Sequence, residues 1–193
     1  DESRLAALSE LGNLYFMAGN MDQAASRMRE TADLHEKLKD EAGLGSTLDS
    51  LGSILKEKND LKGAEECFGR AMEIKEKQNE TEGLAELYGN RVNVLLMLGK
   101  LDVAEKLIKK SMRTNKKSGN EVGLMKDYRN MGNLSMQKTD WPNADKFYKN
   151  ALEINNKTNN RYEISEDYRN RGNLYLQKED WGLCEKLSLQ ALE

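Results

Sequence analysis

The sequence is poor in the residues that interrupt helices or build strands. It has one proline, three phenylalanines and two tryptophans in 193 residues. Strands favour aromatic and β-branched residues bounded by turn signals. The long segments of this chain are instead rich in Leu, Ala, Glu, Lys, Met and Gln, which are good helix formers. This composition predicts an all-α protein.

Several functional classes lack their residue signals. The chain has one histidine and two cysteines, which predicts neither a disulfide framework nor a clustered zinc site. No run approaches eighteen apolar residues and no signal peptide is present, so we expect a cytoplasmic protein that does not enter a membrane. The net charge of −3 provides no global basic field for nucleic acid. No catalytic constellation or glycine-rich phosphate loop appears, so we expect no enzyme, no metal and no cofactor.

What the chain does have is a repeat of forty residues. Small residues recur at linked offsets: Gly12, Gly52, Val92, Gly132 and Gly172, followed twelve positions later by Ala24, Ala64, Ala104, Ala144 and Cys184. Five repeats in register cover the chain, at about 1–40, 41–80, 81–120, 121–160 and 161–193. We expect one solenoid, because one such repeat cannot bury its apolar face alone. We also expect a fragment of a longer protein.

Each repeat is predicted to contain two helices. Leu44, Leu48, Leu51 and Leu55 are spaced four, three and four, as on one face of a helix. Short breakers separate this first helix from a second one, where Asp60, Asp140 and Asp180 are placed to cap. Glycine in mid-helix costs about 1 kcal/mol against alanine. We therefore expect the repeated glycines to admit the partner helix, opposite Ala24, Ala64, Ala144 and Cys184.

These residues resemble the tetratricopeptide repeat (TPR). The family pattern of Leu-Gly, Tyr, Ala, an aromatic and Ala is similar to "LGNLY" at 11–15 and to Ala144, Tyr148 and Ala151. The forty-residue period looks like the longer branch found in kinesin light chains, in the polarity adaptor LGN and in bacterial peptide-sensing regulators. The resemblance implies a right-handed α-solenoid whose first helices line a concave groove for partners.

A polar stripe follows each first helix opposite its apolar face. Asparagine recurs one position after the small anchor, and it can bind the backbone of an extended peptide through both its donor and its acceptor. Arginine provides a fork of donors that fits a carboxylate. The predicted peptide-binding residues are Asn93, Lys126, Arg129, Asn130, Asn133, Arg169, Asn170 and Asn173.

The predicted function is therefore a non-enzymatic scaffold that binds an extended, acidic peptide of a protein partner. One alternative is a structural module that assembles end to end into a homo-oligomer through uncapped solenoid ends. Another is the sensory domain of a regulator. Nucleic acid and membranes are not predicted partners.

Two further pairs of residues raise questions. Arg91 and Arg171 occupy an apolar position of the repeat, where a charge must either extend outward to solvent or find a carboxylate. Both alternatives stay open at the level of sequence. Trp141 and Trp181 are expected to pack into the core at the start of the second helix.

Overall fold

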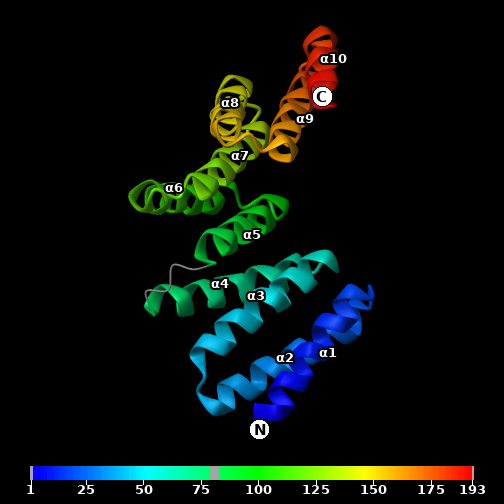
Figure 1. The fold of residues 1–193 in the computed structure, drawn as a ribbon, viewed down its shortest axis with the longest axis vertical. Coiled ribbons are helices and arrows are strands. Elements are labelled where there is room, and N and C mark those ends of the chain that lie inside the picture. The colour runs from blue at the N-terminus through cyan, green and yellow to red at the C-terminus, as the bar shows by residue number, and fades with distance from the viewer. Residues whose placement is uncertain (1, 79–82, 193) are drawn as a thin grey trace. The chain divides into compact units, whose positions relative to one another are not determined.

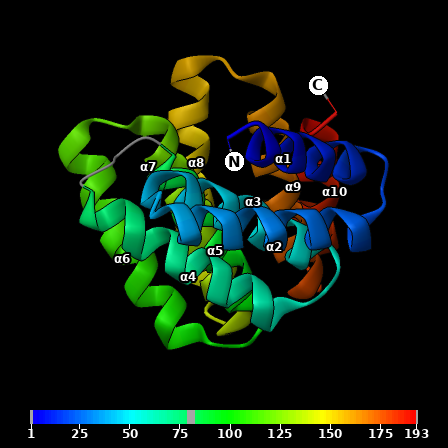
Figure 2. The same cartoon turned by 90° about the horizontal axis from the view of Figure 1, so that it is seen from below.

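The computed structural model describes residues 2–78 and 83–192, which form ten α-helices and no strand. These helices fall into two compact units, residues 1–100 and 101–193. We describe each unit by itself, as unit 1 and unit 2 (Figures 1 and 2). Unit 1 contains α1 (Glu2–Met17), α2 (Met21–Leu38), α3 (Glu41–Glu57), α4 (Leu61–Lys77) and α5 (Leu84–Met97). Unit 2 contains α6 (Leu101–Ser118), α7 (Glu121–Gln137), α8 (Trp141–Thr158), α9 (Arg161–Gln177) and α10 (Trp181–Gln190).

The predicted repeat boundaries near 40, 120 and 160 fall in short turns between helices. The boundary at 80/81 lies outside the described residues.

The turn inside each repeat has the same geometry in all five copies. Its residue with positive φ, which lets the chain leave the first helix, is in turn Gly19, Asn59, Gly99, Thr139 and Glu179. The next residue then caps the second helix in most copies. Asp60, for example, accepts a hydrogen bond from the Gly63 amide at 3.0 Å. Asp140 and Asp180 do the same with Asn143 and Leu183, so the three predicted caps are confirmed.

Helices adjacent in the chain pack against one another within each unit. The alanines of the second helices form the centre of these contacts, since Ala24, Ala64, Ala104 and Ala144 are completely buried. Because helices approach closely where side chains are small, this part of the repeat prediction is confirmed.

The role of the repeated glycines is only partly as predicted. A Cβ added to Gly52 would lie 2.7 Å from the Phe68 ring, and one added to Gly132 would lie 2.4 Å from the Tyr148 ring. The glycines therefore do admit the partner helix. The expectation that Gly52 and Gly132 face Ala64 and Ala144 is wrong, because what they admit is a large aromatic side chain one turn further along that helix.

Within each unit, the second helix of one repeat packs against the first helix of the next, as α2 does on α3 and α8 on α9. One repeat position of the first helix shows how strongly this packing buries its side chains. Its residues Ile54, Val94, Leu134 and Leu174 are at most 2% exposed. The matching Leu14 of α1 is 55% exposed. Burial at this position therefore comes from the neighbouring repeat.

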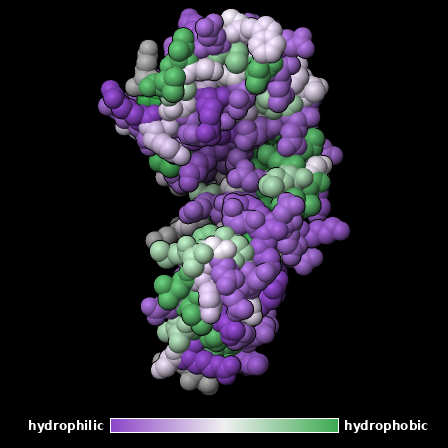
Figure 3. Space-filling model, turned by 90° about the vertical axis from the view of Figure 1, so that its right-hand side faces the viewer, coloured by the Kyte–Doolittle hydropathy of each residue, from purple (hydrophilic) through white to green (hydrophobic). Residues whose placement is uncertain are grey.

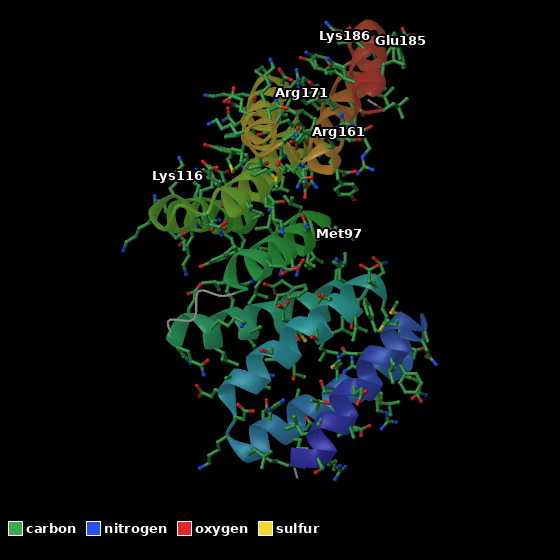
Figure 4. All side chains as sticks on the ribbon, in the orientation of Figure 1. Met97, Lys116, Arg161, Arg171, Glu185 and Lys186 are labelled. Carbon is green, nitrogen blue, oxygen red and sulfur yellow. The ribbon has the colours of Figure 1, made fainter. Side chains whose placement is uncertain are left out.

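The two unusual arginines both find a carboxylate. Arg91 of α5 donates to Glu65 of α4 at 2.8 Å, and Arg171 of α9 donates to Asp145 of α8 at 2.9 Å. Arg171 is labelled in Figure 4. The sequence left these alternatives open, and the structure selects pairing between adjacent repeats over extension to solvent.

The two tryptophans behave differently. Trp141 is half-buried and packs against Ala144, Tyr148 and Leu174. Trp181 is 63% exposed, so the prediction that it packs into the core is wrong. Trp141 is covered because α9 packs on α8, and no described helix of unit 2 packs on α10 in that way.

The face drawn in Figure 3 is mostly hydrophilic, with some hydrophobic residues at the surface.

Candidate peptide-binding face

Seven of the eight predicted site residues lie in unit 2. Lys126, Arg129, Asn130 and Asn133 are on α7, and Arg169, Asn170 and Asn173 are on α9. We call these seven residues the polar face of unit 2. Asn93 lies on α5 of unit 1 and is exposed. The spacing along α7 and α9 puts each set on one side of its helix.

Arg129 connects α7 directly to α9. Its guanidinium group donates to the side chains of Asp167 and Glu163, and Nη2 also donates to the Glu163 carbonyl oxygen at 2.6 Å. Burial alone would lower the pKa of Arg129, but the ion pairs with the two carboxylates outweigh it and raise the pKa. These bonds link the first helices of repeats four and five through their side chains and one backbone carbonyl. They also occupy the donors that the sequence interpretation assigned to a ligand.

Asp167, the main partner of Arg129, is fully buried. Its second carboxylate oxygen accepts a hydrogen bond from Asn155 Nδ2 of α8 at 2.6 Å. Three helices of unit 2 therefore meet at this one carboxylate. Asp167 and Glu163 were not among the predicted site residues. The available signal was an aspartate at a position that holds Thr47 or Leu87 in other repeats.

Asn133 is oriented by Tyr148, the aromatic residue of the repeat pattern in α8. The Tyr148 hydroxyl of α8 donates to Asn133 Oδ1 at 2.7 Å. Burial raises the pKa of the Tyr148 hydroxyl above its usual value, so this hydroxyl keeps its proton at neutral pH. With Oδ1 occupied, the Asn133 amide keeps its two N–H donors, which have no partner among the described residues. Asn133 itself is half-buried.

The remaining residues of the polar face differ in accessibility. Lys126 and Asn173 are exposed, and the side chain of Arg169 is 63% exposed while it pairs with Glu166 one turn away. Asn170 is half-buried. Asn130 is 7% exposed and lies mostly within the packed interior of α7. The groups that a ligand can reach without rearrangement are therefore Lys126, Asn133, Arg169, Asn170 and Asn173.

The equivalent face of unit 1 differs in charge. Asp49 of α3 lies near Glu86 and Asn90 of α5, and burial together with the Glu86 carboxylate raises the pKa of Asp49. Asp49 occupies the position of Arg129 in the repeat. The two units therefore present different charges at matching positions of their first helices.

The part of the chain that the structure describes offers few groups for metal binding or nucleophilic catalysis. No group of three or more His, Cys, Asp and Glu side chains could hold a metal ion there. Cys67 and Cys184 are free and half-buried, and burial raises the pKa of the Cys67 thiol, which disfavours the nucleophilic thiolate. None of the described helices has the length and apolar character needed to cross a bilayer.

Comparison with known proteins places this geometry in a fold family. A family model described as the MalT-like TPR region matches residues 1–187. No match was found among curated proteins. Solved structures with similar folds include BtubC (BKLC) from P. vanneervenii, with 21% identity and a TM-score of 0.80 over 99% of this chain and 81% of that one.

Two further structures have the same fold. A putative kinesin light chain from Podosopora anserina, with nearly identical TPR-like repeats, has 15% identity and a TM-score of 0.80 over 98% of this chain and 93% of that one. A Rap protein complexed with competence and sporulation factor has 12% identity and a TM-score of 0.79, covering 97% of this chain and 54% of that one. These likenesses confirm an all-α fold of TPR-like helical hairpins. With the family match over nearly its whole length, the chain belongs to the MalT-like TPR family.

Proposed function

We propose that the chain is a non-enzymatic interaction module that binds an extended peptide along the polar faces of its first helices. The observation that supports this most directly is the amide of Asn133, held by Tyr148 with its N–H donors unpaired. A side-chain amide fixed in this way can donate to a peptide carbonyl without losing much conformational freedom on binding. Asn173 and, in unit 1, Asn93 occupy the same repeat position and are exposed.

Charge gives this peptide site a preference for acidic ligands. Lys126 and Arg169 are the exposed cations of the polar face. Among the described residues, Arg169 pairs only with Glu166 on its own helix, and exposed pairs of this kind are weak. A ligand carboxylate can therefore compete for Arg169. We assign Arg129 and Asn130 a supporting role, since Arg129 is occupied by Asp167 and Glu163 and Asn130 is buried.

One structural neighbour supports the proposal from outside the chain. The Rap protein was solved with competence and sporulation factor, so a fold of this kind can hold such a ligand. The family is one of repeat scaffolds, whose partners are generally proteins.

The test is capture of peptides from an array of short extended sequences by the whole chain. The double variant Arg169→Ala/Asn173→Ala should bind its acidic ligands about thirtyfold more weakly, because each removed donor contributes about 1 kcal/mol. A matched control, Lys146→Ala/Asn156→Ala, removes one cation and one amide from exposed positions of α8. Equal capture by the first variant and the wild-type chain would contradict this site.

Self-association is a second candidate function with an observation in its favour. Leu14 of α1 and Leu189 of α10 are 55% and 57% exposed, and exposed apolar side chains in clusters favour contacts between molecules. Light scattering over a range of protein concentrations tests it. A molar mass that stays at the monomer value would count against this function and leave peptide binding unaffected.

A further inference from the structure

The second helix of repeat three, α6, has an outer face made of basic residues. Six lysines and arginines occupy twelve consecutive positions, and all six are exposed. We call them the basic stripe of α6: Lys106, Lys109, Lys110, Arg113, Lys116 and Lys117. Because an α-helix advances 100° per residue, Lys106, Arg113 and Lys117 lie within a narrow sector. The buried face of α6, with Ala104, Ile108 and Ser111, is on the opposite side.

The stripe is a property of this helix and not of the repeat. The same six positions carry a net charge of −1 in α2, −1 in α4 and +2 in α8, against +6 in α6. Arg113 is the clearest case, since the matching residues of α2, α4 and α8 are all acidic: Asp33, Glu73 and Glu153. Repetition of the sequence therefore does not account for the stripe.

Neighbouring carboxylates do not account for it either. Lys109 pairs with Glu105, but Glu105 also pairs with Lys138 of α7. Lys106, Arg113, Lys116 and Lys117 make no ion pair within the described residues. Lys116 is labelled on α6 in Figure 4.

Helix electrostatics explains only the end of the stripe. Lys116 and Lys117 lie in the last turn, where cations interact favourably with the helix dipole. The other four residues lie earlier in the helix. Like charges three or four residues apart destabilise a helix by a few tenths of a kcal/mol per pair. Among these four, Lys106 and Arg113 therefore make no stabilising ion pair within α6, whereas Lys109 pairs with Glu105.

The net charge of the rest of unit 2 limits how wide a partner of the basic stripe can be. Residues 101–193 contain 17 basic and 14 acidic residues, so unit 2 without the stripe is net acidic. A broad polyanion would meet that acidic surface as well, within the Debye length of about 10 Å at 0.1 M salt. A partner about as wide as one helix would meet mainly the stripe.

The composition of α6 distinguishes among the remaining classes of anionic partner. The helix has no aromatic residue, and proteins that bind single-stranded nucleic acid use aromatic side chains to stack bases. No large apolar side chain is exposed between Lys106 and Lys117, whereas helices that lie in a bilayer interface insert an apolar face. A chain of carboxylates needs neither feature.

We infer that the basic stripe of α6 is a docking surface for an Asp/Glu-rich segment of a partner protein. This surface is separate from the polar face of unit 2, which lies on the first helices α7 and α9. The segment would run along α6 for about 16 Å, the length of eleven residues at 1.5 Å each. Its carboxylates would meet cations spaced at one or two turns.

The experiment measures binding of a fluorescein-labelled glutamate-rich peptide to the whole chain by anisotropy at low ionic strength. The triple variant Lys106→Gln/Arg113→Gln/Lys117→Gln should bind roughly tenfold more weakly, as expected for the loss of three surface ion pairs. Circular dichroism checks that it stays helical. The charge-preserving variant Lys106→Arg/Lys117→Arg should bind like the wild-type chain.

A matched control removes three exposed lysines of unit 2 outside α6, in Lys146→Gln/Lys157→Gln/Lys186→Gln. This control variant should keep most of the wild-type affinity for the glutamate-rich peptide. Equal loss in both triple variants, or no binding of the peptide to the wild-type chain, would overturn the inference. So would stronger stripe-dependent binding to a single-stranded oligonucleotide or to phosphatidylserine vesicles, or stripe-dependent self-association in sedimentation.

Discussion

At the scale of single residues, two buried aspartates at the same repeat position differ in whether a cation is their partner. Asp127 of α7 and Asp167 of α9 are both buried and both accept a hydrogen bond from an asparagine, Asn115 or Asn155. Among the described residues, only Asp167 has a cation as its partner, Arg129, although burial still raises the pKa of Asp167. Burial raises the pKa of Asp127 to about 6, although Ser111 and Asn115 favour its charged form.

This difference predicts how stability depends on pH. The pKa of Asp127 is higher in the folded state than in the unfolded state, so its contribution is fully present below about pH 4 and is lost as pH rises through about 6. Asp127→Asn keeps the shape and removes the charge. It should raise the free energy of unfolding at pH 8 by about 3 kcal/mol and leave it nearly unchanged at pH 4. Urea unfolding at both pH values measures this.

Asp167→Asn is the matched comparison at the equivalent position. It removes a partner from Arg129, so it should lower the free energy of unfolding at pH 8 by about 1–3 kcal/mol. If both asparagine variants changed stability in the same direction at pH 8, the assignment of the two environments would be incorrect.

At the scale of helices, Arg129 determines how α7 and α9 are held together. Arg129→Ala would leave the carboxylate of Asp167 buried without a cation, which costs about 3 kcal/mol. Arg169→Ala removes an exposed arginine from the same repeat position of α9 and should cost less than about 0.5 kcal/mol. Thermal unfolding of the two variants gives the comparison. A similar midpoint for both would show that the Arg129 network is not maintained in solution.

This result also decides which arginine can be used to study ligand binding. Loss of peptide capture in Arg129→Ala would mix an effect on folding with an effect on recognition. Arg169 and Asn173 are exposed, so their substitution reports on the ligand alone.

At the scale of the molecule, the contribution of a side chain to the free energy of unfolding depends on its place in the series of repeats. Leu14 and Leu134 are the same residue type at the same repeat position, but they are 55% and 2% exposed. Leu134→Ala should lower the free energy of unfolding by about 2–5 kcal/mol, as for a buried leucine. Leu14→Ala should cost less than about 1 kcal/mol.

Denaturant unfolding at two protein concentrations measures these differences. A large cost for Leu14→Ala that grows with concentration would mean that another molecule covers the exposed face of α1 in solution. That outcome would favour the self-association function over a purely monomeric module.

Much of the fold was predictable because its signals are local or periodic. The caps at Asp60, Asp140 and Asp180 depend on residues three positions away, and the buried alanines recur every forty residues. The exposure of Trp181 was not predictable from its repeat position. It depends on whether another helix packs over α10, and Trp141 at the same position is half-buried.

The sequence by itself determined the helices, their caps, the repeat and the side of each first helix on which polar groups gather. Only the tertiary structure decided which of those groups satisfy one another. Arg129 binds Asp167, 38 residues away, and Asn133 accepts from Tyr148, 15 residues away. The physical reason is that a charge or an amide pairs with whatever lies within about 3 Å in space. In a stack of repeats, that neighbour belongs to another helix.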